Sequence, residues 1–260
     1  MGNSTSTIDY QSIPENLLDV PLIKWQVFTS HNSYLRDVQH LTVCSAKNVV
    51  DSMKVGSRCI LLDIYYVNSK FVIAHGDGNN PTTIPVSLQE CLDAIVLHAF
   101  EFTTDPLIIM FEVCSDSIHN LELSNKIRET LGQLLLSPNQ LDSSVWQTPI
   151  GNLRNKIMVI SDANLPIDID LTSESIGVHS NISSNVFKEK IAAGTLNPNT
   201  RWYSTWQSDN LLAAFGHNYD PSPMLEAGCQ AVSMNVLVND SGMKKYKSWF
   251  DNHGFKLLSI

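Results

Sequence analysis

Five polar residues that can move protons or hold a cation lie at the ends of apolar runs of strand length in this 260-residue sequence. They are His31, Asn32, Asp63, His75 and Glu112. A pair of histidines suits proton transfer or the stabilisation of developing charge. Amide and carboxylate oxygens suit a hard cation such as Ca²⁺ or Mg²⁺. If the preceding strands are neighbours in one sheet, these residues predict an acid–base site beside an oxygen-ligated metal.

Taken singly, each histidine is typical of a surface or structural residue, so the prediction depends on the shared placement of the five residues. Zinc held by the two histidines and Asp63 is a second hypothesis for the metal. The sequence has no HExxH motif and no close histidine spacing to support it, and this favours the hard cation.

Apolar runs of strand length alternate with helical patterns along the chain. The strand-like runs cover residues 23–28, 58–64, 71–74, 107–113, 156–160 and 230–238. Helical spacing of apolar residues ends near Gly56 and returns over residues 88–99 and 118–136. Buried-type strands that alternate with amphipathic helices favour a mostly parallel α/β sheet or barrel. In both architectures the site is built by polar residues at the carboxyl ends of strands.

The composition is that of a packed, acidic protein. Hydrophobic residues make up 43% of the chain, and 17 Lys and Arg against 26 Asp and Glu give a net charge of −9. The absence of any Lys/Arg run argues against a broad electrostatic grip on nucleic acid or anionic lipid. No segment approaches the ~20 apolar residues of a membrane span, and no secretory signal pattern is present. Five cysteines without CxxC spacing indicate buried thiols in a reducing compartment. We therefore expect a cytoplasmic protein without nucleic-acid partners.

Ordered motifs in the sequence resemble the two halves of the catalytic region of eukaryotic phosphoinositide-specific phospholipase C. Those similar to the X half are SHNSYL at 30–35, GSRCILLD at 56–63, HG at 75–76 and PLIIMFE at 106–112. Those similar to the Y half are NYDP at 218–221, AGCQAVSMN at 227–235 and the closing segment 250–258.

The resemblance implies a compact, single-domain form of this family, with the α/β fold of a distorted (β/α)8 TIM-type barrel. The barrel is expected over residues 20–260, after a tail of residues 1–19. Its X-like half covers about 20–162 and its Y-like half about 201–260, with a short polar connection at about 163–200 between them.

The resemblance also implies the reaction: a Ca²⁺-assisted phosphodiesterase that cleaves phosphatidylinositol lipids to diacylglycerol and a cyclic or acyclic inositol phosphate. It gives His31 the role of stabilising the charged transition state at phosphorus. It gives His75 the role of general acid toward the leaving diacylglycerol oxygen. Asn32, Asp63 and Glu112 would hold Ca²⁺, and Asp63 or Glu112 would act as the base.

One departure from the family pattern concerns the metal. The family usually has a glutamate two residues before the aspartate of the second motif, and this chain has Leu61 there. Residues 61 and 63 point to the same face of a strand, so an apolar side chain would lie beside the metal position. Ca²⁺ takes six to eight oxygens, and its affinity follows ligand charge. We therefore expect weaker calcium binding, completed by water and substrate phosphate.

A second departure concerns the headgroup. Where the family places lysines that pair with ring phosphates, this chain has Ile160-Ser161-Asp162. A carboxylate in place of a lysine repels phosphate, so unsubstituted phosphatidylinositol is the expected substrate. The Arg-x-Tyr motif that normally precedes Asn-Tyr is not recognisable before residue 218. The residues expected to contact substrate are Arg58, Arg201, Tyr203 and Tyr219.

The N-terminus fits the pattern for N-myristoylation at Gly2 once Met1 is removed. A myristoyl chain gives marginal, reversible membrane binding, which apolar rim residues such as Trp202 and Trp206 could assist. We expect peripheral association with a membrane that carries the phosphoinositide substrate. The alternative hypotheses are a catalytically impaired or inactive relative that binds lipid headgroups or proteins, suggested by Leu61 and Asp162, and a myristoylated scaffold.

Overall fold

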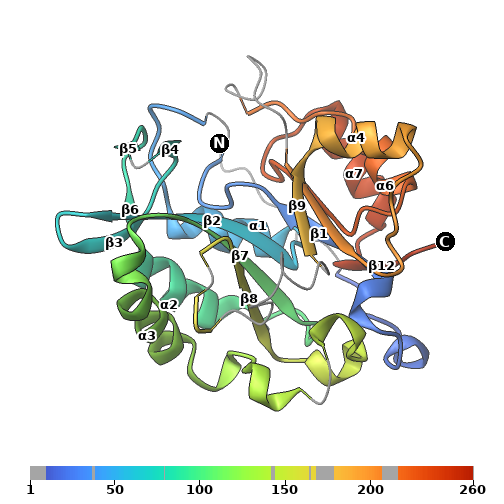
Figure 1. Cartoon of the computed structure of the whole chain (residues 1–260), viewed down its shortest axis with the longest axis horizontal. Helices are drawn as coiled ribbons and strands as arrows, with labels where there is room; N and C mark the ends of the chain where they lie inside the picture. The colour runs from blue at the N-terminus through green and yellow to red at the C-terminus, as the bar shows by residue number, and fades with distance from the viewer. Residues whose placement is uncertain are drawn as a thin grey trace, which may run out of the picture.

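The computed structural model describes residues 10–36, 39–78, 80–141, 144–163, 165–167, 179–206 and 216–259. A row of parallel strands forms its centre (Figure 1). In spatial order the strands are β8 (Ile157–Ser161), β7 (Leu107–Cys114), β2 (Cys59–Val67), β1 (Trp25–Ser30), β11 (Ala231–Met234), β10 (Trp202–Trp206) and β9 (His179–Ser183). Among the described residues no pairing joins β8 to β9, so the barrel is open at that seam.

Helices lie between the parallel strands along the chain. They are α1 (Ala46–Lys54), α2 (Leu88–His98), α3 (Asn120–Leu131), α4 (Ser184–Ala192), α6 (Ser222–Glu226) and α7 (Ser241–Phe250). Short 3-10 turns are η1 (Glu15–Leu17), η2 (Leu22–Lys24), η3 (Ser117–His119), η4 (Gly132–Leu134), η5 (Pro138–Gln140), η6 (Val145–Gln147) and η7 (Ile150–Leu153). Figure 1 shows α2 and α3 together on one side of the sheet, and α4, α6 and α7 grouped on the other.

Short antiparallel strands complete the sheet. They are β3 (Lys70–Ile73), which pairs with β2, β6 (Val86–Ser87), which pairs with β3, and β12 (Phe255–Leu257), which pairs with β1. A separate hairpin joins β4 (Gly76–Asp77) to β5 (Asn80–Pro81). Because β12 lies against the first half of β1, it does not fill the seam between β8 and β9.

Side chains alternate between two faces of the row, because successive residues of a strand point to opposite sides. In β2, Ile60 and Leu62 pack on the outer face in one core with residues of α1, α2 and α3. Cys59 and Leu61 pack on the inner face, together with Trp202 of β10. Because both faces of β2 are packed against apolar neighbours, nearly every residue of the strand is apolar in the sequence.

The predicted alternation of strands and helices is confirmed, with two differences. Strand β1 begins at Trp25 and not at residue 23, because Pro21 starts the 3-10 turn Leu22–Lys24. The connection expected over residues 163–200 contains β9 and α4. Strand β9 has no apolar pattern in the sequence because the inner face of the barrel is polar between β9 and β10. At this position Ser204 Oγ donates to Asn181 Oδ1 at 2.8 Å.

The five cysteines are free thiols, and all but Cys114 are buried. Burial raises the pKa of the Cys59 and Cys229 thiols to about 12, so they stay protonated at neutral pH. None of the helices in the described ranges is both long and apolar enough to span a bilayer.

Candidate active site

Carboxylates lie at the carboxyl ends of the neighbouring strands β2, β7 and β8, at the end of the barrel that we call the mouth. The inward-facing residues of these strands form two apolar layers, Cys59, Ile108 and Met158 followed by Leu61, Met110 and Ile160. The next position of each inward series is acidic, namely Asp63, Glu112 and Asp162. Asp63 is buried, whereas Glu112 and Asp162 are exposed. An apolar floor thus ends in charged groups at the mouth.

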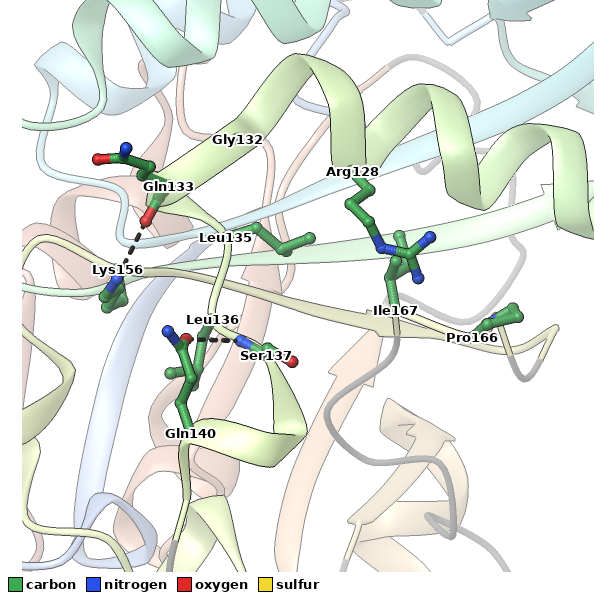
Figure 2. Close-up of a pocket in the computed structure, with 10 residues that line it drawn as sticks. All are labelled: Arg128, Gly132, Gln133, Leu135, Leu136, Ser137, Gln140, Lys156, Pro166 and Ile167. Carbon is green, nitrogen blue, oxygen red and sulfur yellow. Dashed lines mark hydrogen bonds between the residues drawn. The ribbon is translucent and has the colours of Figure 1, made fainter.

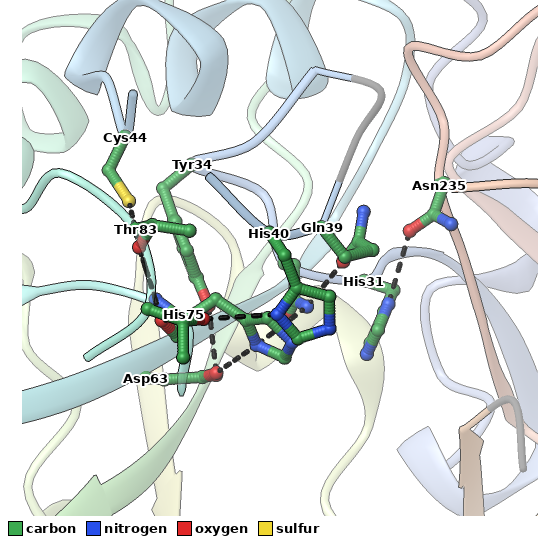
Figure 3. A network of polar contacts seen from close by, with 11 residues as sticks. His31, Tyr34, Gln39, His40, Cys44, Asp63, His75, Thr83 and Asn235 are labelled. Carbon is green, nitrogen blue, oxygen red and sulfur yellow. Dashed lines mark hydrogen bonds and ion pairs between the residues drawn. The ribbon is translucent and has the colours of Figure 1, made fainter. Parts of the chain in front are cut away.

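His75 lies beside Asp63 although it follows a different strand. Strand β3 runs back along β2, and the Ala74 N–H donates to the Asp63 carbonyl oxygen at 3.2 Å. This places His75 Nδ1 at 3.3 Å from Asp63 Oδ2 (Figure 3). An ionised carboxylate only accepts hydrogen bonds, so His75 Nδ1 carries the hydrogen and donates it to Asp63. The other ring nitrogen, Nε2, is then the proton-exchanging atom of His75.

The buried phenol of Tyr34 holds the same carboxylate in place. Its hydroxyl donates to Asp63 Oδ2 at 2.7 Å. Burial, and then the charge of Asp63, raise the pKa of Tyr34 well above its ordinary value. Tyr34 therefore stays protonated and remains a hydrogen-bond donor to Asp63.

His31 is oriented by Asn235, which follows β11 at the mouth. Its Nδ1 lies 3.1 Å from Asn235 Oδ1. The amide cannot be turned over without loss, because Asn235 Nδ2 donates to the Gly216 carbonyl at 2.9 Å. The Asn235 N–H donates in turn to Asn218 Oδ1 at 2.7 Å. His31 Nδ1 is consequently the donor to Asn235, and Nε2 is the ring nitrogen that does not face Asn235.

Asn32 connects the two histidines. It is buried, and its Nδ2 donates to Gln39 Oε1 at 2.7 Å and lies 3.4 Å from His75 Nδ1. Its φ of 41° lies in the left-handed region, which asparagine tolerates better than most residues. The adjacent Ser33 N–H donates to the Leu61 carbonyl at 3.0 Å and ties this turn to β2. The structure therefore brings His31, Asn32, Asp63 and His75 together.

Several residues at the site were missed by the sequence analysis. His40 is exposed, and its ring centroid lies 5.2 Å from that of His75. Tyr34 and Gln39 come from the loop after β1 but lie several residues beyond the end of that strand. Tyr34 falls within the SHNSYL motif without being singled out by it, and no sequence signal marks Gln39. Asn235 does carry a signal, because it is the first polar residue after β11 and obeys the rule that identified His31.

The donor chemistry of the mouth fits a hard cation, although the ligand set is small. Asp63 and Glu112 are register partners on neighbouring strands. Asn32 adds an amide oxygen, since its nitrogen is directed to Gln39. Leu61 faces the same side as Asp63, as predicted, and is 9% exposed. Within the described ranges, no three His, Cys, Asp or Glu side chains form a cluster that could hold a metal.

The prediction that Arg58 binds substrate is wrong. Arg58 precedes β2, at the amino end of the barrel, and is 2% exposed. Its guanidinium donates to three carbonyl oxygens, of Ala99 and Asp105 at 2.8 Å and of Pro106 at 3.1 Å. The residue lies at the opposite end of the strand from Asp63 and joins backbone segments there.

Two of the other predicted substrate contacts, Arg201 and Tyr203, also lie away from the mouth. Arg201 precedes β10, at the amino end of that strand. Tyr203 packs on the outer face against Phe187, with ring centroids 5.6 Å apart. The Tyr219 hydroxyl donates to the Ser233 carbonyl at 3.3 Å. The predictions for Arg201 and Tyr203 are therefore corrected, because Arg201 lies at the amino end of the barrel and Tyr203 faces the helical layer, whereas a substrate contact by Tyr219 stays a prediction.

The predicted membrane-facing residues Trp202 and Trp206 and the predicted lipidation site Gly2 have different outcomes. Trp202 is fully buried and stacks on Trp146, with ring centroids 4.8 Å apart, so it is not a rim residue. Trp206 is partly buried at the end of β10. Gly2 lies outside the described residues.

Outside the mouth, a cavity of about 480 Å³ lies on the outer side of the barrel, between the end of α3 and β8. Arg128, Lys156, Gln140 and Ile167 are among the residues that line it (Figure 2). Lys156 Nζ already donates to the Gln133 carbonyl at 3.0 Å. None of the predicted site residues lines this cavity, so it is separate from the histidine site.

Some known proteins are similar to this chain in sequence, and solved structures are similar to it in fold. Phosphoinositide phospholipase C 2 of Arabidopsis thaliana is 32% identical over 144 residues, which cover 55% of this chain and 24% of that protein. The 1-phosphatidylinositol 4,5-bisphosphate phosphodiesterase gamma-2 of Rattus norvegicus is 27% identical over 159 residues, which cover 60% of this chain and 12% of the relative. The chain thus spans a quarter or less of the length of these relatives.

Solved structures give the fold. PLC21 of S. officinalis superposes with a TM-score of 0.76 at 20% identity, over 92% of this chain and 37% of that one. A calcium-dependent phosphoinositol-specific phospholipase C from a Pseudomonas species gives a TM-score of 0.59 at 10% identity, over 95% and 98% of the two chains. The predicted distorted TIM-type barrel is confirmed by these similarities.

The family model described as phosphatidylinositol-specific phospholipase C, X domain, matches residues 18–162, more than half of the chain. This segment carries His31, Asn32, Asp63, His75 and Glu112. The chain belongs to the phosphatidylinositol-specific phospholipase C X-domain family.

Proposed function

We propose that this protein is a phosphodiesterase that cleaves phosphatidylinositol lipids to diacylglycerol and an inositol phosphate, cyclic or acyclic. The observation that carries the proposal is the pair of oriented histidines at one mouth. His31 is held by Asn235 and His75 by Asp63, and Asn32 lies between them. Family membership supplies the reaction class, and this geometry supplies groups able to perform it.

In the proposed reaction, the inositol 2-hydroxyl attacks phosphorus and the bond to the diacylglycerol oxygen breaks. Glu112 at the mouth takes the proton of the attacking hydroxyl. His75 in its imidazolium form gives the Nε2 proton to the leaving oxygen, and Asp63 stabilises the charge on that ring. His31 stabilises the negative charge that develops on the phosphoryl oxygens. Water then opens the cyclic product in a second step, in which the proton-transfer roles are reversed. His75 accepts the proton of the attacking water, and Glu112 returns its proton to the inositol oxygen.

We further propose that Asn32, Asp63 and Glu112 hold Ca²⁺. When bound, the ion would lower the pKa of the attacking hydroxyl and neutralise phosphate charge. The site has one carboxylate fewer than the family pattern because of Leu61, so its affinity should be low. The Pseudomonas protein similar in fold is described as calcium-dependent.

Membrane contact is assigned to an apolar rim made of Leu41, Val43 and Ile84, which are 94%, 58% and 61% exposed. Val43 and Ile84 are bridged across two segments that adjoin the site. The Thr82 hydroxyl donates to the His75 carbonyl, and the Leu41 N–H to the Thr82 carbonyl. Exposed aliphatic side chains beside a lipid-cleaving site support peripheral membrane association of a cytoplasmic protein. Myristoylation of Gly2 would add to it.

Leu61 also favours a second candidate, a relative that binds inositol lipids and turns them over poorly or not at all. It removes a charge from the mouth while leaving the histidines in place. Both functions predict binding to vesicles, and only the first predicts turnover.

The test is release of water-soluble inositol phosphate from phosphatidylinositol vesicles, with millimolar Ca²⁺ or with EGTA. His31→Ala and His75→Ala should each lower the rate by about 10²–10⁴-fold. The matched control is His98→Ala on α2, where the imidazole contacts Glu101, and it should leave the rate unchanged. Vesicle binding without turnover at millimolar Ca²⁺ would establish the second candidate, and turnover that resists EGTA would remove calcium from the proposal.

A further inference from the structure

A third imidazole, that of His40, lies at the mouth and takes no part in the proposed chemical steps. Its ring centroid is 5.2 Å from that of His75, and the two ring planes are tilted by 45° (Figure 3). His40 is exposed, whereas His31 and His75 are each partly buried. An exposed ring that rests on the proposed general acid is well placed to meet the group that this acid protonates.

The segment that carries His40 is fixed to the segment that follows β5. The Leu41 N–H donates to the Thr82 carbonyl at 3.3 Å. The Ile84 N–H donates in the opposite direction, to the Thr42 carbonyl at 2.9 Å. His40 is therefore held at a defined place, although its side chain is exposed.

One nitrogen of the His40 ring is bonded within the protein and the other can act as a donor. His40 Nδ1 lies 3.0 Å from Thr82 Oγ1. The His75 carbonyl, which the Thr82 hydroxyl also contacts, accepts the Thr82 N–H at 2.8 Å, so the hydroxyl hydrogen can be directed to His40. Neutral His40 then carries its own hydrogen on Nε2. Repulsion between two adjacent imidazolium rings favours this neutral form beside a charged His75.

His40 lies on the lipid side of the phosphodiester in the proposed reaction. His75 protonates the oxygen that leaves with diacylglycerol, so the glycerol group begins directly beyond that oxygen. His40 connects this point to the apolar rim, because its ring contacts His75 and its chain neighbour Leu41 is the most exposed residue of that rim. The glycerol oxygens of the lipid accept hydrogen bonds, and this matches a donor at His40 Nε2.

We infer that His40 is a substrate-binding residue for the leaving group, and that its Nε2 donates to an oxygen of the glycerol backbone. The inference rests on the proposed function and adds to it a contact on the side of the phosphodiester away from the inositol ring. This contact exists only while the lipid is intact. His40 therefore acts in cleavage of the lipid and has no role in the later opening of the cyclic inositol phosphate, which contains no glycerol.

The test compares these two steps at millimolar Ca²⁺. Cleavage is measured with monomeric dihexanoylphosphatidylinositol, which requires no membrane, and ring opening with soluble inositol cyclic phosphate. His40→Asn keeps a polar group for Thr82 at the place of Nδ1 and removes Nε2. It should lower kcat/KM for the lipid about tenfold, the effect of one lost hydrogen bond, and leave ring opening within about twofold of wild type. His40→Gln places an amide N–H near the position of Nε2 and should restore most of the lipid cleavage.

Two further variants separate contact with the leaving group from a purely structural role. His75→Ala should lower both steps, because His75 acts in each of them. His98→Asn on the outer helix α2 is the matched control and should change neither. An equal loss of both steps in His40→Asn would show that His40 only positions His75 and would overturn the inference. Lipid cleavage by His40→Asn at the wild-type rate would also overturn it.

Binding decides the matter if the wild-type protein shows no turnover and the phosphodiesterase proposal fails. Glycerophosphoinositol and inositol methyl phosphate are diesters of equal charge, and only the first contains glycerol. Calorimetry should show that the wild-type protein binds glycerophosphoinositol several-fold more tightly, and that His40→Asn binds the two alike. Equal affinity of the wild-type protein for both diesters would then overturn the role of His40.

Discussion

At the scale of single residues, the two histidines of the site differ in the group that contacts Nδ1 of each ring. A carboxylate lies behind His75, and an amide lies behind His31. The carboxylate stabilises an imidazolium, whereas the amide oxygen fixes orientation with less effect on charge. Two chemically identical rings are thereby given different electrostatic surroundings.

Asn235→Asp tests this difference. A carboxylate against Nδ1 should raise the pKa of His31 and move the limb of the pH–rate profile that reports His31 to higher pH. Asn235→Ala should lower kcat by about 10–100-fold, because the ring loses its fixed orientation. Thermal unfolding of both variants serves as the control for folding, since Asn235 also contacts Gly216 and Asn218. An unchanged pH profile in a folded Asn235→Asp protein would contradict the orienting role.

Asp162 gives a prediction about stability and pH. Its pKa is raised above the ordinary 3.8, chiefly because neighbouring groups at the mouth partly desolvate a carboxylate whose outer atoms remain exposed, so the folded protein binds this proton more tightly than the unfolded chain does. The stability contributed by the protonated group is fully present below the unfolded pKa and is lost as pH rises through the folded pKa. Asp162→Asn should therefore raise Tm slightly at pH 7, because solvent screens much of the effect at this exposed position, and should have little effect below the unfolded pKa. Calorimetric scans at several pH values would measure this, and a Tm gain that does not depend on pH would contradict it.

At the scale of elements, Arg58 explains how the amino end of the barrel is held. It joins the start of β2 to the segment between α2 and β7 through three carbonyl oxygens. The Tyr10 hydroxyl donates to Asp105 Oδ2 at 2.9 Å and brings the beginning of the described chain to the same place. A buried polar group of this kind supports several loops at once and leaves the mouth unaffected.

Arg58→Met should destabilise the fold by about 3 kcal/mol or more, because it leaves buried carbonyls without donors, each at a cost of about 1–3 kcal/mol. The stability of Arg58→Lys should lie between that of the wild type and that of Arg58→Met, since an ammonium cannot reproduce the planar fork of the guanidinium. Urea unfolding measures the loss. The rate per folded molecule should stay within about twofold of wild type, and a large rise in KM without loss of stability would restore the substrate-binding role.

Sequence reasoning predicted the elements with strong apolar patterns and missed those without them. Strand β2 could be predicted because both of its faces are buried. Strand β9 could not, because its inner-face residue Asn181 meets a polar neighbour. His75 was identified by the end of β3, but its pairing with Asp63 depends on β3 running antiparallel to β2. Arg58 illustrates the opposite error, in which a motif residue has a structural role.

At the scale of the whole molecule, the mouth combines charge within and aliphatic side chains around it. The apolar rim lies on the loop after β1 and on the segment after β5, close to His75. Under the proposed function, a lipid headgroup would enter from a bilayer contacted by these side chains. Membrane contact and catalysis would therefore share one end of the barrel.

Leu41→Asp should lower vesicle binding about tenfold, because burial of a leucine side chain is worth about 1.5–3 kcal/mol. Leu97→Asp is the matched control, since Leu97 is an exposed leucine on the outer helix α2. Vesicle co-sedimentation measures binding, and hydrolysis of soluble inositol cyclic phosphate should be equal in both variants. An equal loss of binding in both variants would exclude the rim as the membrane contact.

The proposed attachment through the aliphatic rim would reverse the usual effect of ionic strength, since the molecule has a net charge of −9. Toward a bilayer rich in acidic lipids the charges repel over about one Debye length, ~8 Å at physiological salt. Added salt shortens that range and strengthens the burial of aliphatic groups when the anion is sulfate or phosphate. Washing with concentrated salt, which strips basic peripheral proteins from membranes, should leave this protein in the pellet.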